Sequence, residues 1–231
     1  MVRYTYVGLP LAVLCFVGVA SAQSALDVNI GFGAIQDKAN PTQVDQALLP
    51  CSGPNDPYGP CASTPSLSGF MLGFGADVML WRKFGVGAAV SLQPAQQTYL
   101  NMNSQAAFQG LNTFSLDSRM ILYDFDAVYE AVHAKRLGIK LRGGIGGANL
   151  RFYQSGSAAN SVLGNQNFSQ YYGSSNHFQV HGGIGVQAYL TDHIFVRPEF
   201  DVHYVTNLNQ QFGRNLITEE LVWLGYSWGE R

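Results

Sequence analysis

The chain has 231 residues and a formal net charge of −2, and charged residues make up only 12% of it. Globular domains contain about 25% charged residues, and basic residues do not cluster here, so the composition argues against nucleic acid as a partner. The 26 glycines and the 13% of aromatic residues are instead typical of a lipid-facing β protein.

Residues 1–22 have the features of a secretory signal peptide. Arg3 precedes a mostly apolar run that ends in Ala-Ser-Ala at residues 20–22, which matches an A-x-A cleavage site. The run is short for a transmembrane helix, which needs about 20 apolar residues, and no later segment is longer. We therefore predict a cleaved signal peptide at residues 1–22 and one exported domain at residues 23–231.

Apolar residues alternate with polar residues or glycine in eight segments of the exported domain. In the first segment, Leu26, Val28 and Ile30 fall on one face of a strand, and Asp27 and Asn29 fall on the other. The pattern predicts strands at about residues 26–34, 68–80, 84–93, 123–130, 137–153, 177–188, 194–204 and 222–228.

The links between these strands alternate in length. Long polar or proline-rich links at residues 36–66, 94–112, 154–175 and 205–213 alternate with short links at residues 81–83, 132–136 and 191–193. Outer-membrane barrels have long outer loops and short periplasmic turns in this order, with an even number of strands. The sequence therefore predicts an all-β fold, an eight-stranded antiparallel up-and-down transmembrane β-barrel.

Charged residues inside the predicted strands lie almost entirely on the polar face. A cation that faced lipid at mid-depth would cost about 2–4 kcal/mol, whereas a cation inside the barrel can pair with an acid. Pairing about the short link 132–136 sets Asp126 opposite Arg142, with Glu130 and Lys140 within diagonal reach. We therefore predict an ionic network in the lumen, made of Asp124, Asp126, Glu130, Lys140, Arg142, Arg197, Glu199 and Asp201.

The role of this network has two interpretations. Pairing about the link 191–193 sets Gly185 opposite Glu199 and His181 opposite His203, so small residues face large ones. An eight-stranded barrel is just wide enough for side chains to fill its interior. A filled, charge-satisfied lumen is therefore the favoured interpretation, and gating or proton-linked transport is the alternative.

The sequence contains few residue patterns that indicate catalysis or metal binding. His177 and His181 have a spacing that suits two metal ligands on a helix, but on a strand it separates them by about 13 Å. His177 near Ser174 and Ser175 is the single local candidate for acyl-transfer chemistry, and no acid completes it. We therefore predict no enzyme activity, no metal site and no cofactor.

Two further groups of residues suit an exported membrane protein. Cys15 belongs to the predicted signal peptide, so Cys51 and Cys61 are left as an even pair, which predicts a disulfide. Aromatic residues gather near the predicted strand ends, where they would form girdles at the two membrane interfaces. This set includes Trp81, Tyr129, Tyr204 and Trp228.

Several features together resemble a known family. They are the signal peptide, Leu-Tyr-Asp-Phe-Asp-Ala-Val-Tyr at residues 122–129, Phe-Val-Arg-Pro-Glu-Phe at residues 195–200 and Leu-Gly-Tyr-Ser-Trp at residues 224–228. With them the chain resembles the small outer-membrane β-barrel superfamily, which includes the outer-membrane protein A transmembrane domain, outer-membrane protein X and the opacity adhesins. The resemblance implies an outer-membrane location, with the lipid bilayer and the barrel-insertion machinery as partners.

From these observations we expect a monomeric barrel without catalysis. Its expected role is envelope structure and surface interaction through extracellular loops, with the link 36–66 as the best candidate for contact with an extracellular ligand. The alternatives are a narrow porin-like channel, an outer-membrane lipid-modifying enzyme and a soluble periplasmic ligand-binding barrel whose apolar faces point inward.

Overall fold

The computed structural model describes residues 25–37, 66–81, 83–102, 111–134, 136–160 and 164–229. The predicted signal peptide and the predicted Cys51–Cys61 disulfide lie outside these residues. The described strands are β1 (Leu26–Asp37), β2 (Gly69–Met79), β3 (Phe84–Leu92), β4 (Gln97–Met102), β5 (Leu111–Ala134), β6 (Leu137–Asn160), β7 (Gly164–Tyr189), β8 (Ile194–Val205) and β9 (Leu216–Trp228), and the helix is α1 (Asn209–Phe212).

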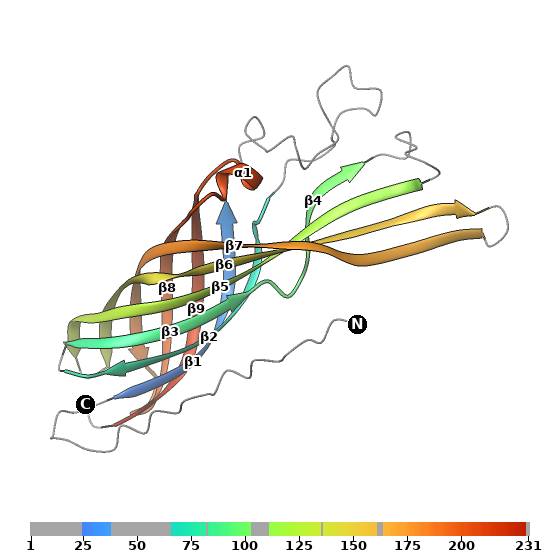
Figure 1. Ribbon diagram of the computed structural model, residues 1–231. Coiled ribbons are helices and arrows are strands. Elements are labelled where there is room, and N and C mark those ends of the chain that lie inside the picture. Colours follow the sequence, from blue (N-terminus) through green and yellow to red (C-terminus); the bar gives the residue numbers. More distant parts are fainter. Residues whose placement is uncertain are drawn as a thin grey trace, which may run out of the picture.

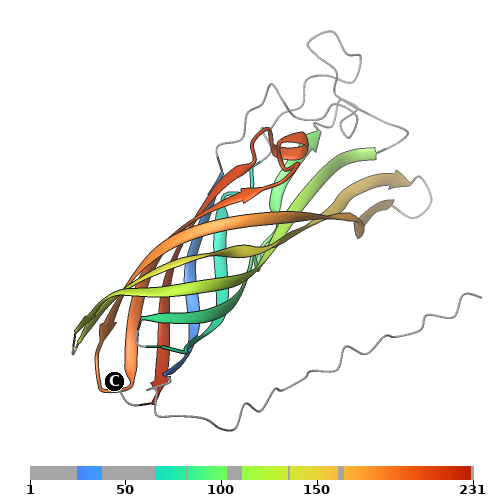
Figure 2. The ribbon, with the colours of Figure 1, turned by 60° about the vertical axis from the view of Figure 1, so that its left-hand side comes forward.

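The strands close into a ring (Figures 1 and 2). Each strand is antiparallel to its neighbours in the order β3-β2-β1-β9-β8-β7-β6-β5, and pairing between β3 and β5 completes the circle. Because β3 and β4 both pair with β5, they are two parts of one interrupted strand, and the ring has eight strands. The predicted eight-stranded antiparallel barrel is confirmed.

Pro94 lies in the interruption between β3 and β4, where its missing N–H breaks the ladder. The side chain of Gln93 bridges the gap, because its Oε1 accepts from the Met120 N–H at 2.9 Å and its Nε2 donates to the Leu67 carbonyl at 2.5 Å. The predicted strand 84–93 ends before Pro94 as expected, but pairing with β5 resumes at β4, so part of the predicted link 94–112 is strand.

The predicted link 154–175 is mostly strand, which corrects the sequence interpretation. Pairing between β6 and β7 continues as far as Asn160 and Gly164, and β5 likewise begins at Leu111 rather than near residue 123. These outer parts of β5, β6 and β7 project past the rest of the barrel (Figure 1). Water is available to both faces of such a projection, so its sequence lacks the apolar alternation that marks the wall.

The wall of the barrel has apolar side chains outside and polar side chains inside. Phe74 and Phe125 are 51% and 62% exposed, whereas Asp126 and Arg197 are 6% and 0% exposed. A soluble barrel would show the opposite arrangement, because its apolar face would be buried. The soluble alternative is therefore contradicted. Among the described residues, no helix has the length and apolar character needed to cross a bilayer.

The lumen holds an apolar core as well as a polar region, which the sequence interpretation did not anticipate. Met71, Leu122 and Trp223 are buried members of this core, together with Leu208 and Phe212 at α1. Leu208 and Phe212 place this core at the end of the barrel that carries α1. The helix thus covers one end of the lumen with its apolar residues.

Candidate functional site: the lumen and the extracellular end

The two ends of the barrel differ in their connections. The short β2–β3, β5–β6 and β7–β8 connections lie at the end where Leu26 pairs with Trp228. The opposite end carries α1 and the long β6–β7 hairpin (Figure 1). Because short turns of outer-membrane barrels face the periplasm, α1 and this hairpin belong to the extracellular end.

An ionic network crosses the lumen nearer the periplasmic end. Lys140 Nζ lies 2.7 Å from Asp27 Oδ2 and 3.3 Å from Asp77 Oδ2. Arg197 Nη1 lies 2.6 Å from the same Asp77 oxygen, and Arg197 Nε lies 2.9 Å from Glu199 Oε2. Four strands, β1, β2, β6 and β8, are thereby joined through the interior rather than around the wall.

Arg142 is the centre of the second half of this network. Its Nε donates to Asp126 Oδ2 at 3.1 Å, its Nη1 lies 3.2 Å from Glu199 Oε1, and its Nη2 lies 3.4 Å from Asp77 Oδ1. Trp223 Nε1 also donates to Glu199 Oε1, at 2.8 Å. A buried cation is tolerated when acids surround it on several sides, so these side chains form one charge-paired cluster.

The register between β5 and β6 corrects one predicted pair. Asp126 lies opposite Gly144 and Arg142 lies opposite Val128, so the prediction that Asp126 faces Arg142 directly was wrong. The cause is the turn, because β5 and β6 pair as far as Ala134 and the ladder shifts next to Glu130. The long Arg142 side chain still reaches Asp126 on the diagonal.

Other predicted network residues find different partners. Glu130 lies directly opposite Lys140, but its Oε1 is 3.1 Å from His133 Nδ1 while Lys140 turns across the lumen. Asp124 Oδ1 accepts from Gln179 Nε2 at 2.5 Å. Asp201 is buried opposite Gly183 on β7 and faces the lumen, where it interacts electrostatically with Arg142 and Glu199 but has no salt bridge within 4.0 Å among the described residues.

The pairing of β7 with β8 agrees with the sequence interpretation. Gly185 lies opposite Glu199, and His181 lies opposite His203. Asp27 and Asp77 were missing from the predicted network although they stand on the polar faces of their strands. Their partner Lys140 is far away along the chain, so hairpin register offers no signal for this contact.

The predicted girdle aromatics lie at both ends of the wall. Trp81 and Trp228 are exposed near the periplasmic turns, and the Tyr129 ring lies 4.9 Å from that of Phe84. Tyr204 is exposed at the other end of the wall, where its hydroxyl accepts from Asn215 Nδ2 at 3.2 Å. Their placement fits aromatic residues at two interfaces.

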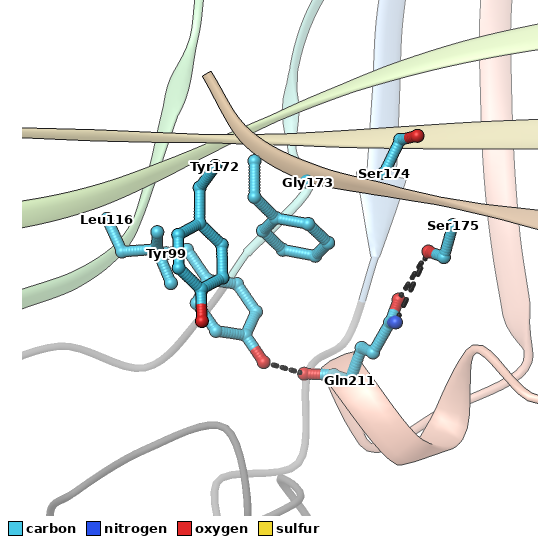
Figure 3. A pocket seen from close by; sticks show the side chains of 8 residues that line it. Tyr99, Leu116, Tyr172, Gly173, Ser174, Ser175 and Gln211 are labelled. Carbon is cyan, nitrogen blue, oxygen red and sulfur yellow. Dashed lines mark hydrogen bonds between the residues drawn. The ribbon is translucent and has the colours of Figure 1, made fainter. Parts of the chain in front are cut away.

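A small pocket of about 180 Å³ opens at the extracellular end (Figure 3). Tyr99 lines the pocket, with its ring 5.2 Å from that of Phe152 and its hydroxyl donating to the Gln211 carbonyl at 2.9 Å. Tyr172 borders it at a shift in the β6–β7 register, where Phe152 pairs with Gly173. The remaining lining residues are Leu116, Gly173, Ser174 and Ser175.

The hairpin of β6 and β7 has one free edge at this end. Pairing of β7 with β8 begins at Gln179 opposite Val205, so residues 164–177 of β7 have only β6 as a strand partner in the described structure. His177 Nδ1 lies 2.8 Å from the Thr206 carbonyl at the base of this segment. We call residues 111–120 of β5, 149–160 of β6 and 164–177 of β7 the extracellular arm.

Closed strands, a lipid-facing apolar wall and a filled ionic lumen together define a small transmembrane β-barrel of the outer-membrane type. The chain belongs to the outer membrane protein beta-barrel domain family, whose model matches residues 7–216. The protein is accordingly an outer-membrane protein, and the lipid bilayer surrounds its wall.

Solved structures with a similar fold include three outer-membrane proteins. The attachment invasion locus protein Ail of Yersinia pestis, crystallised with the heparin analogue sucrose octasulfate, is 11% identical at a TM-score of 0.47, with 89% of this chain and 99% of Ail covered. OprG of Pseudomonas aeruginosa is 13% identical at 0.46, with 90% and 97% covered. Neisserial surface protein A is 11% identical at 0.44, with 88% and 97% covered. Among curated proteins, none is significantly similar in sequence.

Proposed function

We propose that this protein is a monomeric, non-enzymatic barrel that serves envelope structure and surface interaction through its extracellular end. The observation that carries the proposal is the extracellular arm, a stretch of paired strand that continues past the apolar wall. The filled lumen supports the same proposal, because it gives the barrel rigidity and leaves recognition to the end that faces outward.

The outward residues of the arm are suited to water rather than lipid. Below the arm, Phe125, Ile145 and Phe178 are exposed apolar residues on adjacent strands. At the start of the arm, Arg119 lies opposite Arg151 on neighbouring strands. Arginine next to arginine at lipid-facing positions would be costly, so the arm stands outside the hydrocarbon layer.

The arm offers two features that partners commonly use. Tyr171 and Tyr172 are 56% and 60% exposed, and tyrosine is enriched where proteins bind one another. The free edge of β7 at residues 164–177 carries backbone donors and acceptors that an extended segment of another protein can pair with. A hairpin that is already paired strand to strand presents both features with less entropy to lose on binding than an irregular loop would.

The test is adhesion by bacterial cells that display the full chain. In the shortened variant, residues 157–167 are replaced by Asn-Gly, which joins Gly156 to Phe168 in a tight turn that keeps the β6–β7 register. The pair Tyr171→Ser and Tyr172→Ser removes the exposed rings. Adhesion to immobilised collagen, fibronectin and laminin and cell–cell aggregation are measured for each, with Asp192→Ala in a periplasmic turn as the control.

We expect both arm variants to lose binding that the Asp192→Ala control keeps, with equal amounts of heat-modifiable barrel in each outer membrane. Binding that survives both changes would contradict a role for the arm. The channel alternative makes a different prediction, namely conductance of the purified barrel in planar bilayers that changes in Arg142→Ala. Conductance of this kind would contradict a lumen that serves only structure.

A further inference from the structure

A second cluster of side chains lies in the lumen beside the Arg142 network. Asp124 on β5, His181 on β7 and His203 on β8 each bring one potential ligand atom within 4.8 Å of the other two. The imidazole rings of His181 and His203 are stacked, with centroids 5.2 Å apart and planes at 25°. This cluster has no part in the proposed surface interaction.

The hydrogen bonds of His181 leave one ring nitrogen available. Its Nε2 is hydrogen-bonded to the Asp126 carboxylate, which is itself held by Arg142. Its Nδ1 lies 3.2 Å from Asp124 Oδ1 without forming a hydrogen bond. Two ligands of one tetrahedral zinc ion lie about 3.3 Å apart, and metal-bound histidines usually donate their other N–H to a carboxylate.

His203 is 1% exposed, and neither of its ring nitrogens has a hydrogen-bond partner within the described ranges. Its nearest acid is Glu219 on β9, with 3.6 Å between Nε2 and Oε2. Polar groups buried this deeply are nearly always satisfied by protein, water or an ion. The unsatisfied imidazole next to His181 and Asp124 therefore points to a bound group.

The charges that face the cluster favour a cation. Asp124 comes from β5, Asp201 from β8 and Glu219 from β9, and all three are buried. Within the part of the chain that the structure describes, no lysine or arginine nitrogen lies within 4.0 Å of these three carboxylates. A divalent cation between the ligand atoms would pair with these buried carboxylates.

Strand β6 leaves room for the cluster. Gly144 and Gly146 lie between Asp124 on one side and His181 on the other in the sheet. A Cβ atom on Gly146 would lie 2.9 Å from Asp124 Oδ1, closer than side chains tolerate. The glycines therefore let a carboxylate of β5 and an imidazole of β7 approach each other across an intervening strand.

We propose that Asp124, His181 and His203 form a site for a divalent transition-metal ion in the lumen, with Zn²⁺ as the best fit. Two imidazoles and one carboxylate are a ligand set that zinc accepts, whereas calcium and magnesium prefer oxygen ligands alone. Asp126 is a positioning residue, because it orients His181, and Glu219 is the nearest acid beside His203. The site ties together β5, β7 and β8.

Zinc content of the folded barrel tests the proposal. The full chain is refolded in detergent, stripped with a chelator, equilibrated with zinc chloride and passed through gel filtration before elemental analysis. We expect an equimolar amount of zinc in the parent protein and an affinity lower by about tenfold or more in His203→Gln and His181→Gln. His177→Gln and His193→Gln are matched controls, because these histidines lie on β7 and in a turn outside the cluster.

The visible absorption of Co²⁺ bound in place of zinc provides a second measurement. We expect visible absorption bands of four-coordinate Co²⁺ in the parent protein that disappear when zinc is added, and heat-modifiable mobility shows which variants are folded. A folded parent barrel that retains no zinc and gives no such bands overturns the proposal. Equal zinc retention by folded His203→Gln and by the two controls also overturns it.

Discussion

Arg142 and Asp126 form an ion pair on the diagonal of the β5–β6 ladder, with 3.1 Å between Arg142 Nε and Asp126 Oδ2. Gly144 stands directly opposite Asp126, so no side chain blocks the guanidinium from crossing to the acid. The same arginine also contacts Glu199 and Asp77. Strands β2, β5, β6 and β8 are thus held together across the lumen by one buried cation.

Arg142→Met removes this cation with little change in side-chain volume. We expect a loss of about 3–5 kcal/mol in the free energy of unfolding, because Asp126, Glu199 and Asp77 are left as buried acids without it. Urea unfolding of the barrel in lipid vesicles measures the change. Arg151→Met at the exposed surface is the control, and an equal urea midpoint for both variants would refute a stabilising network.

Trp223 packs over glycines of β1 and β2. A Cβ atom on Gly31 would lie 2.7 Å from Trp223 Cε3, so Gly31→Ala has to displace the indole that donates to Glu199. We expect a destabilisation of about 1–3 kcal/mol, typical of overpacking in a filled interior. Gly173→Ala is a matched control, since a Cβ there meets no atom within 4 Å.

Phe125 is 62% exposed on the wall of the barrel, where the structure places lipid. Phe125→Lys should therefore cost about 2–4 kcal/mol of folding free energy in vesicles, the cost of a cation near the bilayer centre. Phe125→Leu should be nearly neutral, because it keeps an apolar surface. Similar unfolding curves for the lysine and leucine variants would place this residue in water.

Phe212 of α1 is 1% exposed and lies 5.2 Å from the Tyr99 ring, measured between ring centroids. Phe212→Ala should cost about 3–5 kcal/mol if the apolar core of the lumen is closely packed. Faster hydrogen exchange of amides in β4 and β9, relative to those near the periplasmic turns, would show that the loss is local to this end. The exposed neighbour Gln210→Ala should leave exchange unchanged.

The wall of the barrel could be predicted from sequence because lipid and an ionic lumen impose a strict two-residue alternation. The strand predicted at residues 194–204 is Ile194–Val205 in the structure. Nearer the outer end this signal disappears, since inward residues such as Leu221 and Trp223 are apolar like their lipid-facing neighbours. The start of β9 was consequently predicted at residue 222 instead of Leu216.

Contacts across the lumen were beyond prediction for a different reason. Hairpin register relates only neighbouring strands, so it could set His181 opposite His203 but not Lys140 beside Asp27, 113 residues away. The third ligand of the proposed metal site, Asp124, also comes from a strand that is not adjacent to β7. Closure of the ring brings these side chains together. The residue pattern within one strand does not indicate which distant strands will meet across the lumen.

Apolar side chains of the barrel wall face lipid, while ionic side chains fill the lumen. A nitroxide scan of residues 121–129 on β5, in vesicles and with the native cysteines replaced by serine, measures this orientation residue by residue. Collision with oxygen dissolved in the membrane should peak at positions 123, 125 and 127 and be lowest at 122, 124, 126 and 128. The opposite phase, or strong collision with a water-soluble nickel reagent at positions 123–127, would show that the apolar face of β5 does not contact lipid.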